Sequence, residues 1–288
     1  MKCNKLILGT VQFGLNYGIN NTQGKPEKEA VFEILYSAYE KGIRYLDTAE
    51  LYGNAHDLIG EFHKLNPTIK FEIITKFPHD FNDSLGHKIN IYLDQLNVEN
   101  LHAILFHSFD SYLKHKEQLG DIVKLKRTKF KYLGVSVYTN EQMNEVLDNI
   151  NIDIIQIPFN LFDNLNLKGQ LLQKAKAKNK IIHTRSAFLQ GLFFMEKDNP
   201  NNIRIKLENE LGLINDISLK SSISIGSIAL NYCLLQPTID GVLIGVDTLE
   251  QLNENIFFST QTIPTIYLDQ INNIKIDNVE LLNPSMWK

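Results

Sequence analysis

Short apolar runs alternate with segments of helical periodicity along this chain of 288 residues. Eight of the runs have the length and the bounding residues of buried strands. Strands that alternate with helices predict a parallel sheet of the α/β class, and eight of them predict closure into a (β/α)8 TIM barrel. A single barrel domain over residues 1–288 suits this length, and no linker or low-complexity tract divides it. The expected strands span residues 5–9, 43–47, 71–76, 101–107, 132–136, 152–157, 180–184 and 241–244.

The intervening segments carry helix signals. In residues 27–41 the apolar side chains recur on one helical face. Two further helices are predicted to begin with capping boxes, one from Thr139 to Gln142 and one from Thr248 to Gln251. The first two signals fall between expected strands, and the third follows the eighth strand, as a barrel of alternating strands and helices requires.

An open, doubly wound sheet is the competing fold. Its usual dinucleotide signature, G-x-G-x-x-G after the first strand, is absent, because residues 9–14 read G-T-V-Q-F-G. The count of strands and this absence favour the barrel. Residues 224–235 are expected to form the helix before the last strand, and residues 188–204 an excursion loop after the seventh.

The charge balance excludes some classes of partner. A net charge of −4 gives no electrostatic reason to expect nucleic acid or an anionic membrane. No apolar stretch approaches the roughly 20 residues of a membrane span, and the first apolar run is too short for a signal peptide. The two cysteines, Cys3 and Cys233, suggest neither a disulfide framework nor a metal site. A cytoplasmic protein is therefore expected, and its oligomeric state is left open.

Polar residues follow three neighbouring strands where each strand ends. Asp47 closes the second expected strand, Lys76 the third and His107 the fourth, and Tyr52 lies in the loop after Asp47. Each alone has a structural explanation, such as a helix cap or a satisfied core histidine. Active sites of barrels lie at the carboxyl ends of the strands, and a buried lysine and carboxylate there need each other. Together the four predict a catalytic site.

Residues 47–53, D-T-A-E-L-Y-G, resemble the D-T-A-x-x-Y-G signature of the aldo-keto reductase family. Residues 73–76, I-I-T-K, resemble the lysine strand of that family, and residues 105–108, L-F-H-S, its histidine strand. The likeness keeps its order across the chain, from L-G-T at residues 8–10 to the G-x5-Q-L-x-E-N run at residues 245–255. By this resemblance the catalytic tetrad is Asp47, Tyr52, Lys76 and His107.

The resemblance implies NAD(P)H-dependent reduction of a small aldehyde or ketone to an alcohol, or the reverse oxidation. The tyrosine phenol, an acid with a pKa of about 10, would protonate the carbonyl oxygen. Lys76 would make Tyr52 a readier donor by favouring its phenolate. Asp47 would hold Lys76, and His107 would orient the carbonyl.

The cofactor residues also follow from the resemblance. Arg185 stands where the family usually has an aromatic, so it would cover the nicotinamide or reach the pyrophosphate. In the stretch where NADPH-selective members usually have a lysine or arginine, this chain has Asp247 in the loop and Gln251 at a position that is often arginine. The choice between NADP and NAD is therefore left open. The expected cofactor contacts are Thr10, Asp47, Ser136, Gln156, Arg185, Ser186, Gly191, Gly245, Asp247, Gln251 and Asn255.

Other functions remain possible from the sequence. A cofactor-binding regulatory subunit would keep the barrel, and a non-redox isomerase or lyase would use Asp47, Lys76 and His107 for proton transfer. Residues 12–18 weakly resemble members linked to sugar and polysaccharide metabolism, which is an analogy only. Trp287 would either close the substrate pocket or anchor the end of the chain on the barrel.

Overall fold

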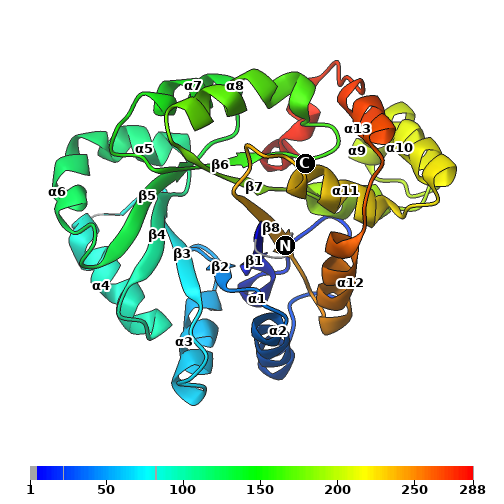
Figure 1. Cartoon of the computed structure of the whole chain (residues 1–288). Helices are drawn as coiled ribbons and strands as arrows, with labels where there is room; N and C mark the ends of the chain where they lie inside the picture. The colour runs from blue at the N-terminus through cyan, green and yellow to red at the C-terminus, as the bar shows by residue number, and fades with distance from the viewer. Residues whose placement is uncertain (1–4, 22, 82, 288) are drawn as a thin grey trace.

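A computed structural model describes residues 5–21, 23–81 and 83–287. At its centre, eight parallel strands close into a barrel in which each strand pairs with the next and β8 pairs with β1 (Figure 1). The (β/α)8 prediction is therefore confirmed, with strand ends shifted by at most two residues. The strands are β1 (Leu6–Gly9), β2 (Tyr45–Asp47), β3 (Glu72–Phe77), β4 (Leu101–Phe106), β5 (Phe130–Ser136), β6 (Ile154–Pro158), β7 (Ile181–Arg185) and β8 (Gly241–Gly245).

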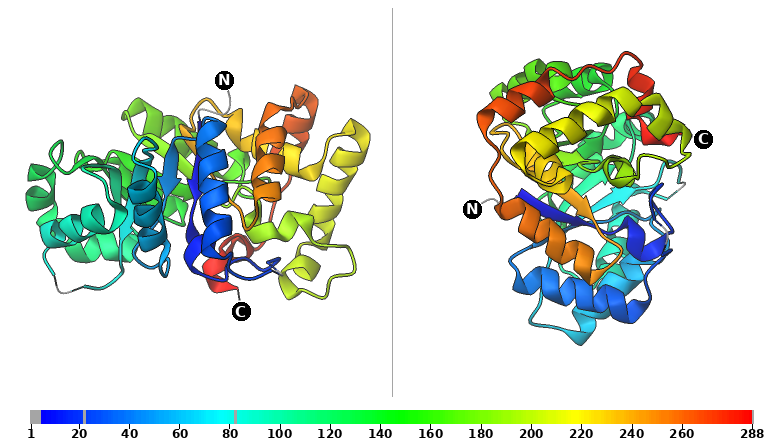
Figure 2. Two further views of the ribbon diagram at one scale, coloured as in Figure 1. Left: turned by 90° about the horizontal axis from the view of Figure 1, so that it is seen from below. Right: turned by 90° about the vertical axis from the view of Figure 1, so that its right-hand side faces the viewer.

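Helices surround the barrel on its outside (Figures 1 and 2). None of the described helices is both long and apolar enough to cross a membrane. The α-helices are α1 (Val11–Gly14), α2 (Lys28–Glu40), α3 (Ala55–Leu65), α4 (Leu85–Leu96), α5 (Phe109–His115), α6 (Leu119–Lys124), α7 (Asn140–Leu147), α8 (Leu165–Ala177), α9 (Asn202–Lys206), α10 (Glu208–Ser221), α11 (Ile225–Leu234), α12 (Leu249–Thr260) and α13 (Thr265–Asn272). The short 3-10 helices are η2 (Lys116–Gln118), η3 (Leu189–Phe194), η4 (Val279–Leu282) and η5 (Pro284–Met286).

The two predicted capping boxes differ in outcome. At α7 the box is complete, because Thr139 Oγ1 accepts the N–H of Gln142 and Gln142 Oε1 accepts the N–H of Thr139. At α12 only half of it forms. Thr248 Oγ1 accepts the N–H of Gln251, but Gln251 Oε1 accepts the N–H of Asp247 at 2.7 Å. The Gln251 side chain thereby fixes the loop after β8.

The expectation of a loop over residues 188–204 is wrong in part. The segment contains η3 and the beginning of α9, whose first N–H groups are capped by Asn201. Within η3 the backbone is left-handed at Leu189, Gln190 and Gly191, with φ of 47°, 54° and 88°. Compact turns of this kind have no apolar periodicity, so the sequence gives no signal for them.

The interior of the barrel is packed with apolar side chains. Ile7, Ile74, Ala103, Leu105 and Ile154 form a small cluster inside the ring of strands, and a larger apolar layer fills the space between strands and helices. Because the barrel is filled, its polar chemistry is confined to the ends of the strands.

The cysteines fit the expectation of free thiols where the structure describes them. Cys233 is buried in α11 and donates its S–H to the carbonyl oxygen of Phe159. Burial raises the pKa of the Cys233 thiol well above its usual value, so this group is inert. Cys3 lies outside the described residues.

Candidate active site

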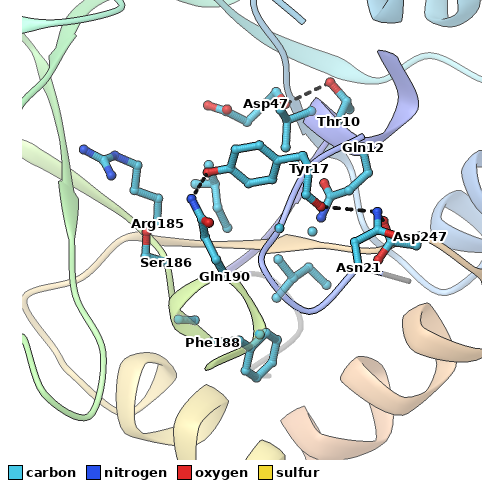
Figure 3. A pocket seen from close by; sticks show the side chains of 18 of the residues that line it. Thr10, Gln12, Tyr17, Asn21, Asp47, Arg185, Ser186, Phe188, Gln190 and Asp247 are labelled. Atoms are coloured by element: carbon cyan, nitrogen blue, oxygen red, sulfur yellow. Dashed lines mark hydrogen bonds between the residues drawn. The ribbon is translucent and has the colours of Figure 1, made fainter. Parts of the chain in front are cut away.

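A cavity of about 580 Å³ opens at the carboxyl ends of the strands (Figure 3). All of the site residues expected from the sequence line this one cavity, and they come from every strand of the barrel or from the loop or helix that follows it. They are Thr10, Asp47, Tyr52, Lys76, His107, Ser136, Gln156, Arg185, Ser186, Gly191, Gly245, Asp247, Gln251 and Asn255.

A buried ion pair forms the floor of the cavity. Lys76 Nζ donates to Asp47 Oδ1 and, at 3.0 Å, to the carbonyl oxygen of Thr48, and both side chains are almost wholly inaccessible. The second oxygen of the carboxylate accepts a hydrogen bond from Gln156 Nε2 at 2.8 Å. Burial lowers the pKa of Lys76, and the adjacent Asp47 carboxylate offsets part of this shift. The pair holds the ammonium in one place.

The hydroxyl of Tyr52 lies beside this ammonium. Lys76 Nζ is 3.5 Å from the Tyr52 oxygen, and the Tyr52 ring meets the ring of His107 edge to face at 5.6 Å. Burial, followed by the charge of Asp47, raises the pKa of Tyr52 well above 10. The Lys76 ammonium, which is expected to favour the phenolate, does not bring this pKa below its ordinary value, because burial of the hydroxyl is the largest effect.

Two glycines fix the backbone that carries Tyr52. A Cβ at Gly14, the last residue of α1, would overlap the carbonyl oxygen of Tyr52. A Cβ at Gly53 would overlap the carbonyl oxygen of Gly14, and Gly53 has a left-handed φ of 55°. The two backbones thus touch at a place that only glycine permits. This contact holds the loop after β2 against the loop after β1 and places Tyr52 over the cavity.

His107 presents a neutral ring to the cavity. Burial, and then the charges of Lys76 and His79, lower the pKa of His107 to about 3. Its Nδ1 is buried and has no hydrogen-bond partner in the described structure. A neutral imidazole can hydrogen-bond a ligand but carries no positive charge at physiological pH.

The other end of the cavity is acidic. Asp247 and Glu254 line it, and among the described lining residues Lys76 and Arg185 are the only lysine and arginine. Asp247 Oδ1 accepts a hydrogen bond from Asn21 Nδ2 at 3.0 Å, which joins the loop after β1 to the loop after β8 (Figure 3). Burial raises the pKa of Asp247. Among the described lining residues, no lysine or arginine forms an ion pair with Asp247 or Glu254.

Several lining residues were not expected from the sequence. Tyr17 and Tyr138 face the same cavity, and the hydroxyl of Tyr17 accepts a hydrogen bond from Gln190 Nε2 at 3.0 Å (Figure 3). Tyr17 lies in the segment 12–18 and Gln190 in the segment that follows β7, and each segment can be recognised in the sequence. Their contact joins residues far apart in the chain, which a single sequence does not reveal.

Arg185, at the end of β7, also lines the cavity. Its guanidinium carbon lies 4.0 Å from the centre of the Tyr138 ring, and its Nη2 donates to the carbonyl oxygen of Val137 at 3.2 Å. The side chain therefore reaches across β6 to the residue that follows β5.

Trp287 does not line the cavity. Its ring packs on the apolar core and its Nε1–H donates to the carbonyl oxygen of Leu281 at 3.0 Å. Of the two roles expected for Trp287, the structure supports the anchoring of the chain end.

Most of the chain is similar to known oxidoreductases. A sequence profile of the Aldo/keto reductase family matches residues 5–276. An uncharacterized oxidoreductase of Bacillus subtilis is 25% identical over 265 residues, which cover 80% of this chain and 82% of that protein. A Glycine max protein named as an aldo-keto reductase is 30% identical over 150 residues, 47% of this chain and 43% of its own length.

A solved structure supports the same fold. The aldo-keto reductase of Bacillus halodurans, in its holo form, superposes with a TM-score of 0.72 at 17% identity, covering 95% of this chain and 93% of that one. The profile match over nearly the whole barrel, the sequence signature and this structural similarity all indicate the same family. The cavity also lies where barrel enzymes have their active sites. The chain belongs to the aldo-keto reductase family and is an NAD(P)-dependent oxidoreductase.

Proposed function

We propose that the chain reduces an aldehyde or ketone to an alcohol, or catalyses the reverse oxidation, with Tyr52 as the proton donor. The observation that carries this proposal is the placement of the Tyr52 hydroxyl, 3.5 Å from the Lys76 ammonium and beside the neutral ring of His107, in the one cavity. A weak acid held next to a fixed cation suits protonation of an oxygen on which negative charge develops.

The nicotinamide cofactor, when bound, supplies the hydride that adds to the carbonyl carbon. Tyr52 donates its hydroxyl proton to the carbonyl oxygen, and its raised pKa keeps it protonated until negative charge accumulates there. Lys76, held by Asp47, stabilises the phenolate that remains. His107, which is neutral because burial lowers its pKa, donates its one N–H to the same carbonyl oxygen and orients it.

The lining residues fit a nicotinamide dinucleotide. The cavity volume lies within the ordinary range for cofactor sites, about 300–1,000 Å³. Gln12 Oε1 is a buried acceptor with no hydrogen-bond partner in the described structure, and the amide of Gln12 lies against the backbone of Gly245. We assign Ser136 and Gln156 to the carboxamide and Thr10 and Asp47 to the ribose. The remaining contacts are Ser186, Gly191, Gly245, Asp247, Gln251 and Asn255.

The acidic end of the cavity favours NADH over NADPH. A 2′-phosphate adds charge that requires a lysine or arginine, whereas Asp247 and Glu254 would repel it. An aspartate can instead accept a hydrogen bond from the free 2′-hydroxyl of NADH.

Fluorescence titration with NADH and NADPH tests both parts of this proposal. We expect both cofactors to bind, NADH by about tenfold more tightly, a difference of about 1.4 kcal/mol. Absorbance at the nicotinamide band should then fall when aldehydes are added. Binding without oxidation by any carbonyl compound would contradict the reductase and indicate a regulatory subunit. Absence of binding would indicate a non-redox barrel enzyme, and tighter binding of NADPH would refute the cofactor preference alone.

The pH dependence of the reaction provides a further prediction. Because His107 has a pKa of about 3 and Tyr52 one raised above 10, neither group changes charge near neutral pH. We expect kcat/KM for a neutral aldehyde to stay flat between about pH 5 and pH 9 and to fall only above this range, when Tyr52 loses its proton. Initial rates across this range check it. An acidic limb centred near about 6.5, the ordinary pKa of histidine, would contradict the assigned state of His107.

A further inference from the structure

Arg185 is a cation of the cavity with no carboxylate partner. It is half-buried, and in the described part of the chain no Asp or Glu lies within ion-pair distance of it. The other lining cation, Lys76, is paired with Asp47. A guanidinium has five N–H donors, and the described structure gives Arg185 one acceptor, the carbonyl oxygen of Val137.

The donors of Arg185 are open to the cavity, because none of its nitrogens is a buried atom without a partner. A guanidinium that stacks on an aromatic ring is held by the ring but keeps its charge. The Tyr138 ring holds the guanidinium in place without neutralising it. Four N–H donors therefore remain for a molecule that enters the cavity.

Arg185 lies away from the acidic end of the cavity. In Figure 3 its guanidinium and Asp247 lie on opposite sides of the site. Its anchor, Val137, directly follows β5, next to β4 and the His107 that follows it. The charge of Arg185 also acts on Tyr52, whose pKa it lowers slightly against the effect of burial, and on His107, whose pKa it lowers further. Arg185 thus belongs to the neighbourhood of the proton donor.

We propose that Arg185 binds a carboxylate carried by the carbonyl substrate, so that the enzyme acts on aldehydes or ketones that are also carboxylic acids. The planar guanidinium fork matches a carboxylate with two parallel hydrogen bonds. One unpaired positive charge matches one negative charge, whereas a dianionic phosphate would need a second free cation, and the charge of Lys76 is taken by Asp47. The hydroxyl of Tyr17, which accepts from Gln190, keeps its own hydrogen free for the same ligand.

This inference rests on the proposed reductase activity, and it replaces the cofactor contact expected of Arg185 from the sequence. The cofactor contact and the substrate contact make different predictions. A residue that binds the cofactor affects every substrate alike, whereas a residue that binds the substrate carboxylate affects only substrates that carry one.

Matched substrates test the proposal. The pairs are succinic semialdehyde with butanal, and 4-carboxybenzaldehyde with benzaldehyde, with glyceraldehyde 3-phosphate and glyceraldehyde as the phosphate arm. We expect the wild type to favour the carboxylate member by about ten- to a hundredfold in kcat/KM, the range for a charge-assisted hydrogen bond. Arg185→Gln should abolish this preference by raising KM for the carboxylate members, while the neutral members lose much less activity and the Kd of NADH stays close to that of the wild type. Arg185→Lys, which keeps the charge without the fork, should restore it in part.

A second measurement does not depend on turnover. Adding 4-hydroxybutyrate, the alcohol of succinic semialdehyde, to the protein already saturated with NAD+ should raise the Tm of the wild type further, but should not raise that of Arg185→Gln beyond its value with NAD+ alone. The Tm of each unliganded protein controls for folding. An equal loss for charged and neutral substrates, together with weaker NADH binding, would overturn the proposal in favour of a cofactor contact. Preference for the phosphate over the carboxylate would overturn the choice of anion. Failure of both proteins to bind NADH would refute the reductase itself.

Discussion

Tyr52→Phe is expected to lower kcat for carbonyl reduction by about 10²–10⁴-fold, the usual contribution of a positioned general acid. The substitution removes a single oxygen and leaves the ring in its contact with His107. Since no other hydroxyl lies at the Lys76 ammonium in the described structure, nothing takes over the proton transfer. Steady-state rates with a saturating aldehyde measure the effect.

The Kd of NADH from fluorescence titration should stay close to the wild-type value, because the lost group acts on the substrate oxygen. Tyr36→Phe is a matched control, since Tyr36 is an exposed tyrosine of α2 outside the cavity. It should leave kcat and Kd unaltered. A Tyr52→Phe enzyme with wild-type turnover would refute the assignment of the proton donor.

Lys76→Met is expected to lower the free energy of unfolding by about 3–5 kcal/mol, because it leaves the Asp47 carboxylate buried without its cation. The remaining hydrogen bond from Gln156 does not supply a positive charge. Urea unfolding followed by circular dichroism measures the change at neutral pH. A loss of this size is a large part of the stability of a typical domain.

Two further variants separate the orphaned charge from other effects. Lys28→Met breaks the exposed pair between Lys28 and Glu61 and should leave the free energy of unfolding nearly unchanged. The double variant Lys76→Met with Asp47→Leu removes both buried charges and should recover part of the lost stability. A Lys76→Met protein as stable as the wild type would mean that Asp47 takes up a proton at little cost.

Much of the site could be predicted from the sequence because its residues follow strands. Eight strands predict a barrel, and in a barrel the carboxyl ends of the strands meet at one face. Asp47, Lys76 and His107 are therefore expected to lie close together, whatever the loops do. The strands are short apolar runs with clear ends, which is the pattern that sequence reading detects best.

What could not be predicted depends on contacts between loops and on burial. The hydrogen bond between Tyr17 and Gln190 and the stacking of Arg185 on Tyr138 join segments whose separation in the chain hides their proximity. The direction of the Tyr52 pKa shift was also missed, because it follows from how far the hydroxyl is desolvated. A sequence shows which charges are present but not how much water reaches them.

The catalytic ion pair lies in strands, whereas other residues that line the cavity lie in loops, and this has a consequence for the evolution of such an enzyme. Asp47 and Lys76 lie in paired strands, where a substitution disturbs the barrel as well as the chemistry. Tyr17 and Tyr138 stand outside the strands, so these positions can vary while the barrel persists. Selection can therefore retune which molecules are accepted without rebuilding how they are reduced. Enzymes that descend from one ancestor can thus come to reduce different substrates through a few substitutions in the loops that line the cavity.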